Sequence, residues 1–231
     1  MRTIYDSKFK TNVILIVQGE YAVAKYPSII STTLGSCISI CLFDLDKHVG
    51  GINHYMLPGP VLDSKEETII FAKAKYGIHS IEILINELLK LNARKENLKA
   101  KIFGGANMFK KNLTSKPCSK SVAQSHTDIY KNISLISNTV GMQNISFAEK
   151  YLKTENIPIV AKDVGGEDAR KIYFDPATGF VKLFRLNSSS RSNLIQNESQ
   201  YRDKLEQDEK KEQKKSNEVD IDELSKKITL W

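Results

Sequence analysis

The chain has 231 residues, a formal net charge of +7 and a sequence pI of about 9.1, which suits one domain of moderate size with or without a tail. A net positive charge permits nucleic acid as a partner. However, the basic side chains are mixed with acidic ones and do not alternate with aromatic residues, so nucleic-acid binding is disfavoured. The apolar run 13–17 is too short for a signal sequence or a membrane span. Three cysteines without a signal sequence indicate a reducing compartment and no disulfide framework. We therefore expect a soluble cytoplasmic protein without membrane insertion.

Short runs rich in β-branched and apolar residues predict strands along most of the chain. These runs span residues 13–17, 21–25, 29–33, 36–43, 49–57, 98–103, 157–160, 171–174 and 180–186. Helices are expected over 76–92, where apolar residues recur at spacings of three and four, and over 144–154. Because helices and antiparallel hairpins are interspersed, we predict a mixed α/β fold with largely antiparallel sheets packed with helices, and not a doubly wound parallel sheet.

The composition changes after residue 186. Residues 1–186 are expected to form one domain, whereas 187–218 predict a disordered charged linker because they hold too little apolar surface to fold. In residues 219–231 the side chains of Ile221, Leu224, Ile228 and Trp231 repeat at helical spacing. This end of the chain predicts a short amphipathic docking helix on a flexible tether.

The predicted hairpin 36–57 holds the strongest candidate site. If the chain reverses at the bond between Leu45 and Asp46, Cys37 lies directly opposite His54, with the Cβ atoms about 5 Å apart. A thiol and an imidazole at that separation can act as nucleophile and base. The alternatives are a buried structural cysteine and a histidine satisfied within the core, and a bulged turn would separate the two side chains.

A catalytic histidine needs a third group that orients its ring. No acidic residue lies in the apolar parts of the two hairpin strands, so the nearest candidates are Ser31, Thr32 and Thr33 in the preceding segment. The β propensity of threonine explains that cluster equally well.

Other candidate residues predict no further site. Cys41 is expected in the core, since four residues along a strand span about 13 Å and cannot share a zinc ion with Cys37. The four histidines show no metal-ligand spacing, so no metal site is expected. The run 104–107 (GGAN) lacks the pattern of a phosphate-binding loop and predicts a tight strand exit close to another backbone.

Three motifs together resemble one family. They are 34–37 (LGSC), 51–58 (GINHYMLP) and 100–108 (AKIFGGANM), and the likeness continues through 157–160, 164–166 and 170–174. In this order they resemble CheD, the chemoreceptor glutamine deamidases of bacterial chemotaxis, over about residues 13–186. The resemblance implies an α/β sandwich related to deamidating toxins. It also implies hydrolysis of glutamine side-chain amides on methyl-accepting chemotaxis proteins, without a cofactor.

The resemblance implies three site residues, which are a cysteine, a histidine and a threonine. The first two correspond to Cys37 and His54. The family threonine lies six residues before the cysteine, which is Ser31 here, and a shift of one residue would recruit Thr32 instead. Two other functions remain open: a regulatory partner of a CheC-type CheY-phosphate phosphatase with little catalysis, and a cysteine protease or transglutaminase-like acyl transferase.

Overall fold

The computed structural model describes residues 1–7, 9–56, 67–108, 140–186, 193–201, 203–205, 207–208 and 211, with the side chains of 67–76 excepted. The predicted docking helix 219–231 and Cys118 lie outside these residues. In the described part of the chain, no helix is long and apolar enough to cross a membrane.

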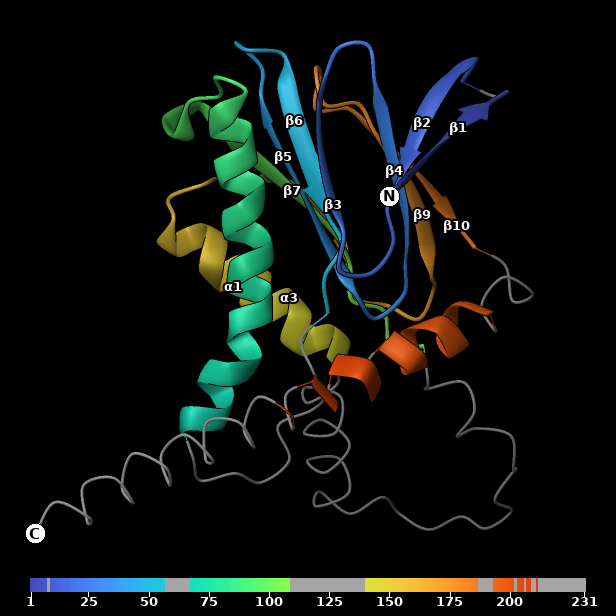
Figure 1. The fold of residues 1–231 in the computed structure, drawn as a ribbon, viewed down its shortest axis with the longest axis vertical. Helices are drawn as coiled ribbons and strands as arrows, with labels where there is room; N and C mark the ends of the chain where they lie inside the picture. The colour runs from blue at the N-terminus through green and yellow to red at the C-terminus, as the bar shows by residue number, and fades with distance from the viewer. Residues whose placement is uncertain are drawn as a thin grey trace, which may run out of the picture.

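Two five-stranded sheets pack face to face (Figure 1). The first sheet has the order β1-β2-β4-β9-β10 and the second the order β3-β6-β5-β7-β8. Their strands are β1 (Arg2–Asp6), β2 (Thr11–Leu15), β3 (Tyr21–Lys25), β4 (Ile29–Leu34), β5 (Ile38–Asp44), β6 (Val49–Asn53), β7 (Lys99–Gly104), β8 (Ile159–Val164), β9 (Arg170–Phe174) and β10 (Val181–Arg185). Neighbouring strands are antiparallel except for the pairs β2/β4 and β7/β8.

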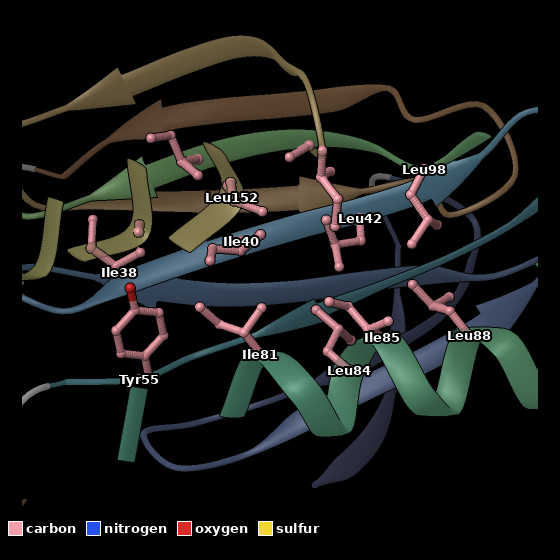
Figure 2. Packing of buried hydrophobic residues seen from close by; sticks show 14 of the residues in the cluster. Ile38, Ile40, Leu42, Tyr55, Ile81, Leu84, Ile85, Leu88, Leu98 and Leu152 are labelled. Atoms are coloured by element: carbon pink, nitrogen blue, oxygen red, sulfur yellow. The ribbon is translucent and has the colours of Figure 1, made fainter. Parts of the chain in front are cut away.

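Two helices, α1 (Glu67–Lys90) and α3 (Val140–Thr154), cover the outer face of the second sheet, and a short 3-10 turn spans Lys95–Asn97. Alternation along β5 divides the apolar residues between two cores. Ile38, Ile40 and Leu42 point towards the helices, where Leu84 and Leu88 of α1 meet them (Figure 2). The opposite face of β5 points into the core between the two sheets. The expectation of mixed sheets packed with helices is confirmed.

The hairpin β5–β6 exists, but its predicted register is wrong. Asp44 pairs with Val49, so the loop is 45–48 and the centre of the hairpin lies one residue further along the chain than expected. The Asp44 carboxylate accepts hydrogen bonds from the amides of Asp46 and Lys47, and His48 takes a left-handed conformation with φ of 52°. Cys37 is therefore not directly opposite His54. Because each pairing partner moves by two residues, the two side chains stay on the same face as diagonal neighbours.

A helix that the sequence analysis did not anticipate lies inside the segment predicted to be a disordered linker. Residues 193–201, 203–205 and 207–208 are helical and are called here the C-terminal helical segment. Figure 1 shows this segment, in orange-red, across the end of the sandwich where β4 and β7 terminate. Its Leu194 and Leu205 are buried, and such contacts explain how a polar sequence becomes ordered here.

Candidate active site

A threonine and a histidine from different sheets meet between the two layers. In β4, Ile30, Thr32 and Leu34 share the face that points into the core between the sheets. His54 follows β6 and is only 1% exposed. Its Nδ1 lies 2.7 Å from Oγ1 of Thr32. The two sheets are therefore joined by a polar contact within a largely apolar layer.

The hydrogen bonds of Thr32 define the tautomer of His54. A hydroxyl has one proton, and that of Thr32 is donated to the carbonyl oxygen of Ile16 at 2.9 Å. Oγ1 must then accept from His54, so Nδ1 carries the proton and Nε2 does not. Among the described residues, Nε2 has no hydrogen-bond partner. This unprotonated nitrogen is available to take a proton from a neighbouring group.

Cys37 lies at the end of the loop that joins β4 to β5. It is fully buried, and its position next to Ile38 places it on the same inter-sheet face as Cys41. Ile38 and Tyr55 exchange two backbone hydrogen bonds of 2.9 Å, so the residues before them on each strand, Cys37 and His54, are held in a defined register.

The backbone around Cys37 is anchored by its carbonyl groups. Gly35 O accepts from the amide of Ala106, and Ser36 O accepts from Nδ2 of Asn144 at 2.8 Å. In a trans peptide the N–H points opposite to the C=O. Anchoring these two carbonyls therefore turns the amides of Ser36 and Cys37 to the other side, where they form a small cradle of N–H donors.

A carboxylate fills this cradle. Glu198, in the C-terminal helical segment, accepts hydrogen bonds from the amides of Gly35 and Ser36 at 3.0 Å each and from the Ser36 hydroxyl at 2.6 Å. The amide of Cys37 donates at 3.5 Å. The Glu198 side chain is 2% exposed, so the cradle binds a carboxylate away from water.

Burial keeps both candidate catalytic groups neutral. It raises the pKa of the Cys37 thiol well above its usual range, and the nearby negative charge of Glu198 raises that pKa further. Burial also lowers the pKa of His54 to about 3. The described state therefore holds a thiol beside a neutral imidazole, and not a thiolate–imidazolium pair.

A pocket of about 650 Å³ lies beside Thr32 and His54. Ile16 lines it on the side of the sheets, and Leu194 and Asn197 line it from the C-terminal helical segment. Movement of that segment would therefore widen the approach to the histidine.

The loop that supports Cys37 depends on two further segments. Gly104 ends β7 with φ of 112°, and its carbonyl accepts from the amide of Gly165. Arg170, whose side chain is fully buried, binds the carboxylate of Asp163 and the carbonyls of Gly165 and Asp168. The prediction that run 104–107 approaches another backbone is confirmed, since a Cβ atom on Gly104 would lie 2.1 Å from the carbonyl oxygen of Cys37.

Replacing Gly104 with alanine is expected to displace the Cys37 loop. The substitution adds a side chain at a positive φ and a clash with backbone, so we expect a loss of about 2 kcal/mol or more in the free energy of unfolding, with a large loss of activity. Gly166→Ala is the matched control, because its φ is 72° but nothing lies within 4 Å of the added carbon. It should lose about 1 kcal/mol and keep its activity. Urea denaturation of both variants checks this, and equal effects would contradict it.

The buried neutral His54 predicts a dependence of stability on pH. Its pKa is about 3 in the folded protein and about 6.5 when unfolded, so its contribution is complete above pH 6.5 and is lost as the pH falls towards 3. Between pH 7 and pH 5 we expect the wild-type protein to lose about 2 kcal/mol more than the His54→Gln variant. Urea denaturation at both pH values measures the difference, and parallel losses would contradict the assignment.

The structure separates the candidates for the third residue. Thr32 contacts His54, whereas the hydroxyl of Ser31 donates to the carbonyl of Ile172 at 2.8 Å on the other face of β4. Alternation along the strand could have indicated this, because Thr32 shares its parity with Ile30 and Leu34. Glu198 was missed entirely. The sequence does hold one indication of it, because Leu194, Glu198, Tyr201 and Leu205 recur at helical spacing. The charged residue in that series made the apolar face of the helix hard to recognise.

Comparison with known proteins agrees with the motifs. The sequence model of the family described as CheD chemotactic sensory transduction matches residues 56–185, just after His54. A protein of Laribacter hongkongensis named "Probable chemoreceptor glutamine deamidase CheD" is 34% identical over 203 residues, which cover 88% of this chain and 86% of that protein. Proteins with the same name from Janthinobacterium sp. and Methylobacillus flagellatus are each 37% identical over 202 residues, covering 87% of both chains. The chain belongs to the CheD family.

Proposed function

We propose that this protein is a cysteine-dependent deamidase, which hydrolyses glutamine side chains of methyl-accepting chemotaxis proteins to glutamate in the cytoplasm. The observation that carries the proposal is the hydrogen bond between Thr32 and His54, which leaves Nε2 as a base on the same face as Cys37. The names of the family relatives support the substrate class.

In the first half of the reaction, His54 Nε2 takes the proton of the Cys37 thiol and the thiolate attacks Cδ of the glutamine. The resulting tetrahedral intermediate carries a negative oxygen. The amides of Ser36 and Cys37 are oriented to donate to that oxygen, because their peptide carbonyls are anchored on the far side. His54 then returns the proton to the leaving nitrogen, the C–N bond breaks and ammonia departs from a thioester.

In the second half, His54 Nε2 takes a proton from water, which attacks the thioester carbon. The C–S bond breaks, the Cys37 sulfur regains a proton and the product is glutamate. Each turnover consumes one water and releases one ammonia. The imidazolium that forms in both halves is stabilised by donation from Nδ1 to Thr32, which in turn donates to the Ile16 carbonyl.

The test is incubation of the full-length protein with the cytoplasmic fragment of a chemoreceptor. We expect ammonia release and a gain of about one dalton at each converted glutamine, read by peptide mass spectrometry. Peptide cleavage would favour a protease, and a cross-link would favour an acyl transferase. An unchanged fragment would contradict the proposal.

The family resemblance also supports a CheC-type phosphatase as a second partner. A pull-down with the purified phosphatase tests this, with the Cys37→Ala variant present to separate binding from catalysis. Capture by both forms is expected, and capture by neither would contradict the partnership.

Thr32 and Ser31 offer a matched pair for the orienting role. Thr32→Val removes the acceptor of Nδ1, so we expect kcat to fall about 10²-fold while Thr32→Ser restores most of it. Ser31→Ala removes a hydrogen bond to β9 only, so it should cost about 1 kcal/mol of stability and leave kcat nearly unchanged. Steady-state deamidation of the receptor fragment measures both. A larger kcat loss for Ser31→Ala would reverse the assignment.

A further inference from the structure

The C-terminal helical segment presents one face to the catalytic end of the sandwich. Leu194 packs with Ala106 and Met108, Tyr201 packs against the core between the sheets, and Glu198 lies between these two contacts at helical spacing. Glu198 is buried while its helical neighbours Gln196 and Gln200 are exposed. The segment thus buries the Glu198 side chain, while the neighbouring polar side chains stay at the surface.

The environment of that side chain is the cradle next to the proposed nucleophile. Burying a carboxylate is costly unless donors compensate for the lost water, and here two backbone amides, the Ser36 hydroxyl and the more distant Cys37 amide do so. One of these donors, the Cys37 amide, belongs to the residue of the proposed nucleophile. The side chain therefore lies where the electrophile of the proposed reaction has to lie.

The chemical identity of the side chain matches that position. A glutamate side chain is the product of glutamine deamidation, and both of its carboxylate oxygens accept hydrogen bonds in the cradle. Glu198 is presented on a helix, so the surface beneath it already accommodates a helical substrate backbone. These are two independent features of a product complex: the carboxylate in the cradle and the helix that carries it.

We propose that the C-terminal helical segment is an internal product mimic, which occupies the substrate site through Glu198 and competes with the receptor glutamine. This inference rests on the proposed function, and it names Glu198 as the group that occupies the substrate site. It also assigns the surface that contacts Leu194, Glu198 and Tyr201 as the docking surface for the helix that bears the substrate glutamine.

The segment restrains catalysis because Glu198 occupies the cradle. A substrate amide therefore enters only when Glu198 leaves.

The proposal predicts a reaction within the chain itself. In a Glu198→Gln variant, the side chain in the cradle is a carboxamide. The Cys37 sulfur attacks its Cδ, the bond from Cδ to the amide nitrogen breaks and ammonia leaves with the proton supplied through His54. Water then cleaves the Cδ–S bond and leaves a glutamate, so the variant converts itself chemically into the wild-type protein.

Peptide mass spectrometry of the purified full-length Glu198→Gln variant tests this. We expect the side chain at position 198 to gain about one dalton, with Gln196 and Gln200 of the same peptide unchanged. The double variant Cys37→Ala/Glu198→Gln should keep its carboxamide at position 198. A second arm uses Glu198→Ala, which should deamidate the receptor fragment several-fold faster than wild type because the competitor is lost.

Two results would overturn the proposal. The first is a Glu198→Gln variant that deamidates the receptor fragment but keeps its own carboxamide at position 198. That result would reject the product mimic and leave the proposed function standing. The second is a Glu198→Ala variant with slower receptor deamidation and lower stability, which assigns Glu198 to supporting the loop. If the carboxamide of the variant and the receptor fragment both stay unchanged, and wild type is inactive as well, the proposed function and this inference are rejected together.

Discussion

Replacing Cys37 with alanine is expected to lower receptor deamidation by at least about 10⁴-fold, because the reaction loses the atom that forms the thioester. The fold should survive, since the thiol is a small apolar group in the core between the sheets and its removal costs only about 1 kcal/mol. Initial rates of ammonia release and peptide mass spectra measure the effect.

Cys41→Ala is the matched control for that substitution. Cys41 lies four residues along the chain, is equally buried on the same face, and pairs with Ile52 away from His54. It should lose a similar amount of stability and keep near wild-type rates. Activity that persists in Cys37→Ala but falls in Cys41→Ala would show that the nucleophile is assigned to the wrong cysteine.

Replacing His54 with alanine is expected to lower kcat about 10³-fold, because one imidazole moves the proton in both halves of the reaction. The loss should be nearly independent of pH near neutrality, whereas the wild-type rate should fall in acid as Nε2 becomes protonated. His48→Ala is the control, since His48 belongs to the β5–β6 loop and its ring Nδ1 lies 3.4 Å from the Ala177 carbonyl oxygen. Single-turnover rates across pH distinguish the two variants. Equal rates for His54→Ala and wild type would remove the base from the mechanism.

The elements of the fold follow closely from local sequence patterns. The strands predicted at 21–25 and 29–33 are confirmed as β3 and β4. The helix predicted over 76–92 is confirmed as α1, but it begins nine residues earlier, at Glu67. The edge strand β1 was missed because its residues are mostly exposed and polar, and its only partner in the described sheets is β2. Edge strands show little apolar alternation, so the sequence carries a weak signal for them.

The site depended on long-range geometry that local patterns do not contain. Cys37 and His54 share one face of the sheet although each predicted pairing partner was wrong by two residues. A shift of two residues keeps a side chain on the same face. Alternation along β4 indicates that Thr32 and not Ser31 faces the core, but the contact of Thr32 with His54 comes from the packing of the two sheets. Glu198 could not be assigned at all, because its partners lie more than 160 residues earlier in the chain.

The central claim is that this chain hydrolyses receptor glutamine through the Cys37 sulfur. Its most direct test is the reaction of the full-length protein with a receptor cytoplasmic fragment in ¹⁸O-labelled water, with Cys37→Ala run in parallel. Hydrolysis of a thioester puts one solvent oxygen into the product, so each converted glutamine should gain about three daltons with wild type and nothing with the variant. A fragment that stays unchanged with wild type, or that is converted equally by Cys37→Ala, would contradict the account.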